Sequence, residues 1–98
     1  MNVPTTYVLP DELVRIKNEE CIQHAASYGR DPEGLNFTRV ISWMHIGPLR
    51  KTVDKLGRPY VLQWPPTITP DGKVEYVFVV DTDDDAEAFQ DTLKREHG

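Results

Sequence analysis

The chain has 98 residues, of which 39% are hydrophobic and 28% are charged. This length suits one domain with a single core, and the composition excludes collagen-like, mucin-like and fully disordered chains. Eleven Lys and Arg residues against 16 Asp and Glu residues give a net charge of −5, which argues against generic binding of polyanions. We therefore expect one domain over residues 1–98, with frayed ends at 1–4 and 97–98.

The cellular compartment follows from two simple features. The longest uninterrupted apolar run covers residues 76–80, far short of the ~20 residues that a membrane helix needs. The first residues show neither the basic start nor the apolar stretch of a signal peptide. The lone Cys21 excludes an intramolecular disulfide, as expected in a reducing compartment. The sequence predicts a cytoplasmic protein with no membrane segment.

The first predicted element is a helix over residues 10–28. Pro10 suits the first helical position, the acids that follow it favour the positive end of the helix dipole, and Gly29 ends the helix. On a helical wheel one set of residues falls within an arc of about 120° and predicts a stripe that faces the core. The stripe consists of Val14, Cys21, Ile22, Ala25 and Tyr28.

Residues 35–46 fit two structures. β-branched and aromatic residues favour a strand, whereas apolar residues at 37, 40, 41 and 44 fit a helix. Residues 48–56 then predict a short basic helix that begins at Pro48 and ends at Gly57. If 37–46 is instead a buried strand, the helix 48–56 is a surface crossover whose charges are only solvated.

The last third predicts a hairpin and a helix. A strand over 60–64 is interrupted by two prolines, residues 70–73 form a turn, and residues 74–80 alternate as a strand with one apolar face. Asp84 and Glu87 resemble a capping box for the closing helix. We expect Trp43 and Trp64 to be buried. The fold class is α+β: an N-terminal helix, a short basic helix, a β-hairpin or small antiparallel sheet, and a C-terminal helix.

The charges divide the chain into three parts. Residues 1–34 carry six acids against three cations, residues 35–64 one acid against five cations, and residues 65–98 nine acids against three cations. The net charges are −3, +4 and −6. An acidic protein thus contains a basic middle, and the sign of its partner depends on which part is exposed.

A helical 35–45 would place a turn at 44–48 before the basic helix, with the hairpin 59–80 behind it. This order, together with the runs 49–57 and 69–74, resembles winged-helix repressor domains over roughly residues 11–93. The resemblance implies that the helix 48–56 enters the major groove and that the hairpin lies on the phosphate backbone, in a protein that acts as a dimer. The residues it implies as nucleic-acid contacts are Arg39, Arg50, Lys51, Lys55, Arg58 and Lys73.

Other motifs are incomplete. The acids at 81–85 match three positions of a calcium loop, but Ala86 stands where the turn needs glycine and Thr92 where it needs glutamate. Cys21 and His24 supply half of a zinc site at most. No phosphate-binding glycine loop or nucleophile elbow is present, so we expect no cofactor, no metal and no enzymatic activity.

Two functions from different classes remain. The acidic surplus favours a small non-enzymatic interaction protein that binds and modulates a protein partner, basic in charge, as small phage and mobile-element inhibitors do. The alternative is the winged-helix-like dimeric DNA-binding regulator. The acidic surface expected to bind the partner consists of Asp81, Asp83, Asp84, Asp85, Glu87 and Asp91.

Overall fold

The computed structural model describes all residues from Met1 to Gly98. The chain forms an α+β domain with a four-stranded antiparallel sheet, as the sequence predicts in outline. The elements follow one another as β1 (Val3–Val8), α1 (Asp11–Ser27), α2 (Thr38–Met44), α3 (Ile46–Asp54), β2 (Tyr60–Leu62), β3 (Thr67–Ile68), β4 (Val74–Val80) and α4 (Asp83–His97).

Strand β4 is the centre of the sheet. β1 pairs along one side of it, and β2 and β3 pair along the other. The predicted alternation in this strand is confirmed, because Val74, Tyr76, Phe78 and Val80 are all completely buried. The turn at 70–73 is also confirmed: it joins β3 to β4, and Gly72 adopts the positive φ of 87° that the turn requires.

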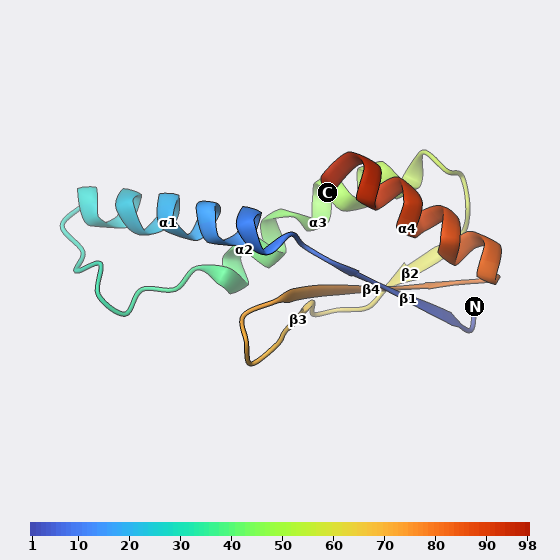
Figure 1. Ribbon diagram of the computed structural model, residues 1–98, viewed down its shortest axis with the longest axis horizontal. Coiled ribbons are helices and arrows are strands. Elements are labelled where there is room, and N and C mark those ends of the chain that lie inside the picture. Colours follow the sequence, from blue (N-terminus) through green and yellow to red (C-terminus); the bar gives the residue numbers. More distant parts are fainter.

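The core lies between one face of the sheet and the helices α3 and α4, which both cover that face (Figure 1). Leu49 and Val53 of α3 and Phe89 and Leu93 of α4 are fully buried there. The rings of Phe78 and Phe89 meet edge to face with centroids 5.9 Å apart. Residues far apart in the sequence therefore build a single two-layer core.

The chain begins with a strand, so the prediction of a leading helix is wrong. Thr5, Tyr7 and Leu9 alternate into the core, and Val3 pairs with Val80 where the sequence predicts a frayed end. Proline is tolerated in β1 because the strand lies at the edge of the sheet, where Pro4 faces away from β4.

The edge of β1 is partly closed to further strand pairing. The amide of Leu9 donates to the carbonyl oxygen of Val74 at 3.0 Å, so the ladder places the backbone groups of Pro4 and Thr6 on the free side. Pro4 has no N–H to offer, and the carbonyl of Thr6 accepts a hydrogen bond of 2.5 Å from the amide of Gln90.

Helix α1 and the loop behind it form an arm that extends away from the sheet (Figure 1). The radius of gyration is 15.2 Å and the longest dimension is 49 Å, whereas a compact domain of this length has a radius of about 13 Å. The predicted apolar stripe of α1 is therefore only partly correct. Val14 alone is fully buried, because the body of the protein does not reach the outer turns of the helix.

Residues 38–44 are helical, which resolves the ambiguity in the sequence; the alternative of a buried strand is wrong. Phe37 and Val40 point toward α1, while Ile41 and Ser42 are buried against the body. The hydroxyl of Tyr76 in β4 donates to the carbonyl oxygen of Ser42 at 2.5 Å, in the interior. This bond ties the arm to the central strand.

Helix α4 begins one residue earlier than the predicted capping box requires. Its cap is Thr82, whose hydroxyl accepts a hydrogen bond of 3.1 Å from the amide of Asp85. Asp84 and Glu87 lie inside the helix instead, where the first-turn acids still face the positive end of the dipole. At the other end, the hydroxyl of Tyr7 donates to the carbonyl of Gly98 at 3.3 Å. None of the helices is long and apolar enough to cross a membrane.

Candidate interaction surfaces

An apolar groove runs along the arm between α1 and the segment that leads into α2. It encloses a hollow of about 600 Å³. The polar residues at its rim are Glu20, His24 and Arg30, and the remainder of the lining is apolar or weakly polar. This lining consists of Cys21, Ala25, Tyr28, Phe37 and Val40.

A second hollow of about 280 Å³ continues this groove toward the body. Glu20 and Cys21 line both hollows, and Met44 and Pro48 line only the second. We call the two hollows together the arm groove. On α1 the groove residues 17, 20, 21, 24 and 28 follow the spacing of three and four that places residues on one helix face.

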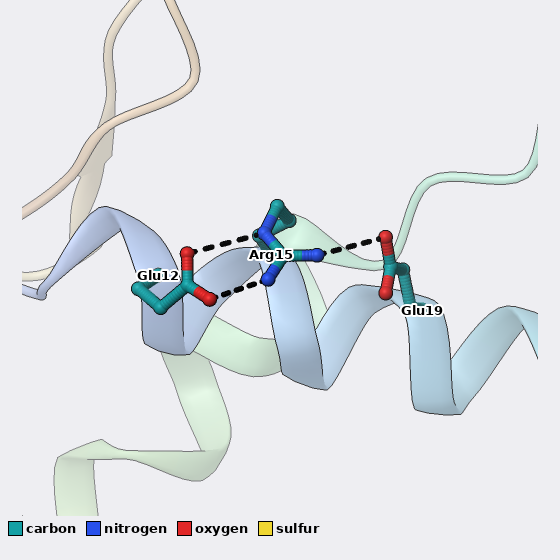
Figure 2. Close-up of polar contacts among 3 residues, drawn as sticks. All are labelled: Glu12, Arg15 and Glu19. Carbon is teal, nitrogen blue, oxygen red and sulfur yellow. Dashed lines mark hydrogen bonds and ion pairs between the residues drawn. The ribbon is translucent and has the colours of Figure 1, made fainter.

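The opposite side of α1 is charged and faces solvent. There Arg15 bridges two carboxylates, pairing with Glu12 one turn before it and with Glu19 one turn after it (Figure 2). Its hydrogen bond and charge hold the pKa of the Glu12 carboxyl below its usual range. This side of the arm therefore has satisfied polar groups, whereas the groove side exposes apolar ones.

Both tryptophans lie at the surface, so the prediction that they are buried is wrong. Trp43 is 46% exposed and Trp64 is 64% exposed. Their rings pack against each other with centroids 6.2 Å apart, joining α2 to the loop after β2. Next to them, Met44 is 62% exposed and Val40 is also exposed. The arm groove and the tryptophan pair thus form one region rich in large apolar side chains.

The predicted acidic surface divides into paired and free carboxylates. Asp81 lies 3.5 Å from the terminal amino group of Met1, and Asp85 forms an ion pair of 2.9 Å with Arg58. The other carboxylates, on α4, are exposed and have no cation within ion-pair distance. They are Asp83, Asp84, Glu87 and Asp91. Residues 84, 87 and 91 follow a spacing of three and four, so they form a stripe on one face of α4.

The predicted nucleic-acid contacts are partly neutralised by carboxylates of the same chain. Arg58 pairs with Asp85 as described, Lys73 lies 3.0 Å from Asp11, and Lys55 lies 3.7 Å from Glu96. The structure leaves three predicted contacts exposed and without an ion pair, namely Arg39, Arg50 and Lys51. Lys73, at the hairpin, is therefore bound to the start of α1.

Arg50 belongs to a small polar cluster with Tyr60. Its guanidinium carbon lies 5.7 Å from the centre of the Tyr60 ring, and the Tyr60 hydroxyl donates to the carboxylate of Asp54 at 2.7 Å. Burial, together with the carboxylate of Asp54, raises the pKa of Tyr60 to about 12, although Arg50 acts in the opposite direction. The cluster fixes the exposed side of α3 against β2.

The α2–α3 pair is a tight helical corner. Only His45 separates the two helices, and it has a helical backbone conformation. Helix-turn-helix motifs use a turn of three to four residues. Helix α3 is moreover held by α4, since Thr52 is hydrogen-bonded to the ring of His97 at 2.7 Å. One side of α3 is thus covered by the closing helix.

The paired acids and the Cys21–His24 pair do not form a metal cluster. No group of three or more His, Cys, Asp or Glu side chains converges on a common point. The ring of His24 instead packs edge to face on Tyr28, with centroids 5.0 Å apart. Comparisons with protein-family models, with curated proteins and with solved structures find no match to this chain.

Proposed function

We propose that the chain is a non-enzymatic protein-interaction module that binds a protein partner through the arm groove and the adjacent tryptophan pair. The observation that carries the proposal is the exposure of Trp43, Met44, Val40 and Tyr28 on one side of an arm that its own body does not cover. Tryptophan, tyrosine and methionine are enriched in protein interfaces, and contiguous apolar patches on soluble proteins mark such interfaces.

The acidic stripe of α4 is the second part of the proposed surface. Its free carboxylates, among them Asp84, Glu87 and Asp91, lie on the body rather than on the arm. Exposed charges of one sign mainly accelerate association and exclude partners of like charge, and they add little affinity. The stripe would therefore favour a basic partner, while the apolar arm supplies the binding energy.

The proposal is tested by immobilising the purified chain and identifying the proteins that it retains from an extract of its source cells. Met44→Asp and Trp43→Ala replace exposed side chains, so both variants keep the fold. We expect the specific partner to be lost in both, with affinities for the purified partner weakened roughly tenfold or more. The matched control is Ile16→Asp, which changes an exposed apolar residue on the solvent side of α1.

A triple variant that neutralises the stripe, Asp84→Asn with Glu87→Gln and Asp91→Asn, separates the two surfaces. We expect slower association and a weaker dependence on salt, with dissociation unchanged. Retention of the partner by Met44→Asp and Trp43→Ala at the affinity of the unmodified chain would overturn the proposal.

A dimeric DNA-binding regulator is the second candidate, favoured by one observation. Residues 38–44 are helical and precede a second helix that carries the exposed Arg50 and Lys51. A DNA reader loses affinity steeply as salt rises, and Arg50→Ala with Lys51→Ala would flatten that slope. Absence of duplex binding at low salt eliminates this candidate.

A further inference from the structure

The arm is the part of the molecule whose stability is least explained by its own contacts. Helix α1 has 17 residues, yet only Val14 is fully buried. Isolated helices of this length are marginal in water, and most helical stability in proteins comes from packing of an apolar face. An apolar face that the chain's own body leaves open therefore calls for cover from another molecule.

The charges at the rim of the groove limit what this molecule can be. Lys17 and Glu20 pair across 3.5 Å, whereas Arg30 lines the same hollow as Glu20 and has no carboxylate within ion-pair distance. A rim with both signs is not complementary to a strongly basic or strongly acidic partner. It is complementary to itself, which is the requirement for a two-fold contact between identical surfaces.

The sequence positions of these charges match such a contact. Glu20 and Arg30 are equally distant from Ala25, which lies in the groove between them. In an antiparallel two-fold contact centred near Ala25, Glu20 of each copy faces Arg30 of the other, and the small side chain at the centre lets the two helices approach closely. Backbone bonding of the Arg30 amide to the carbonyl of Ala25, at 3.2 Å, holds that arginine at the end of α1.

We propose that the arm groove is covered by a second copy of this chain, whose α1 lies antiparallel in it and whose Arg30 pairs with Glu20. The inference rests on the proposed function, because it names the partner of the same apolar surface. Tyr28 and Met44 are then buried between the copies, and both acidic stripes of α4 remain free for a further partner.

The experiment measures the mass of the full chain in solution by sedimentation velocity and light scattering over a wide concentration range. We expect a reversible dimer, whose melting temperature rises with protein concentration because association stabilises the folded state. Tyr28→Glu and Met44→Glu each weaken dimerisation roughly tenfold or more, whereas Ile16→Glu, on the opposite side of α1, leaves it unchanged.

Charge reversal tests the register of the contact. Arg30→Glu places two acidic residues opposite each other and weakens the dimer, and adding Glu20→Arg to it restores dimerisation, because the exchanged charges again meet across the two-fold axis. A partner other than a second copy would not show this rescue. Failure of the double variant to recover any dimer overturns the antiparallel register proposed here.

A monomer at every concentration overturns the inference. If that monomer still retains another protein through Met44 and Trp43, the proposed function stands and the partner is a different protein. If it retains none, both proposals fail. A dimer that is insensitive to Tyr28→Glu and Met44→Glu also overturns the inference, since the copies would then meet elsewhere.

Discussion

At the scale of single residues, buried or half-buried tyrosines join the elements of this protein. The hydroxyl of Tyr76 reaches the backbone of α2, that of Tyr60 reaches Asp54, and that of Tyr7 reaches the last residue of the chain. Burial raises the pKa of all three side chains, which keeps them neutral donors at physiological pH. These residues couple the sheet to three different helical segments.

Removal of one such hydroxyl tests the link between arm and body. Tyr76→Phe deletes the only side-chain donor to the Ser42 carbonyl and should lower the free energy of unfolding by roughly 1–3 kcal/mol. Denaturant unfolding measures the change. Tyr28→Phe is the control, since Tyr28 is 78% exposed and its hydroxyl makes no hydrogen bond within the chain. Equal stability of both variants would contradict the role given to this bond.

The pH dependence follows from Tyr60. Its pKa of about 12 lies above the ordinary value of 10.0 that it has in the unfolded chain, so the folded state holds the proton more tightly. The stabilisation is fully present below pH 10 and is lost as the pH rises toward 12. Tyr76 and Tyr7, whose pKa values are also raised, act in the same direction.

We expect Asp54→Asn to lower the pKa of Tyr60, because the variant removes both the negative charge and the strong acceptor beside the hydroxyl. Ultraviolet titration of tyrosinate formation measures this shift. Tyr60→Phe identifies the signal of this residue among the four tyrosines. A pKa for Tyr60 that is unchanged in Asp54→Asn would show that burial alone sets it.

At the scale of elements, two helices illustrate how capping and charge act together. Helix α4 has acids in its first turn, Lys94 and Arg95 in its last turn and a hydroxyl cap at Thr82. Helix α1 has no side-chain cap and relies on the pairs that Arg15 makes along its solvent side. Surface pairs of this kind are each worth only a few tenths of a kcal/mol, so α1 is the weaker of the two.

Loss of the cap of α4 should therefore be measurable. Thr82→Ala removes the acceptor for the Asp85 amide and should destabilise the protein by about 1 kcal/mol. Thr82→Ser keeps the acceptor and should retain most of the stability. Thermal unfolding compares the two variants. A matched loss in Asp84→Ala would point instead to the capping box that the sequence predicts at Asp84 and Glu87.

At the scale of the whole molecule, the body and the arm differ in stability. The body buries β4 between β1 and the other strands and beneath α3 and α4, whereas the arm contacts the body mainly at its base (Figure 1). Local opening is easiest where few apolar contacts hold the backbone, so opening of α1 should require less free energy than unfolding of the core.

Hydrogen exchange tests this division. At low protein concentration the amides of residues 18–27 in α1 should exchange much faster than those of β4, because the outer turns open without disturbing the core. At high concentration the arm should become protected if a second copy covers it. Equal protection of arm and core at low concentration would contradict the division into two parts.

Much of the fold follows from local patterns. The alternation of residues 74–80, the turn that ends with Gly72 and the spacing of apolar residues in the last helix each reflect one element burying one face, which neighbouring residues determine. The strand at 3–8 carries a signal of the same kind in the alternation of Thr5, Tyr7 and Leu9, but Pro4 conceals it unless the strand lies at an edge. The sequence likewise identifies the basic middle and the acidic ends.

Tertiary structure alone decided the rest. Residues 37–46 fit a helix and a strand equally well by propensity, and packing of Ile41 and Ser42 against the body selects the helix. The tryptophans and the stripe of α1 have the composition of a core but lie where no second layer reaches them. Which cations remain free was also decided in three dimensions, because the partners of Lys55, Arg58 and Lys73 are 27 to 62 residues away or in another helix. Burial and charge pairing depend on distant segments, and a local pattern contains no information about those.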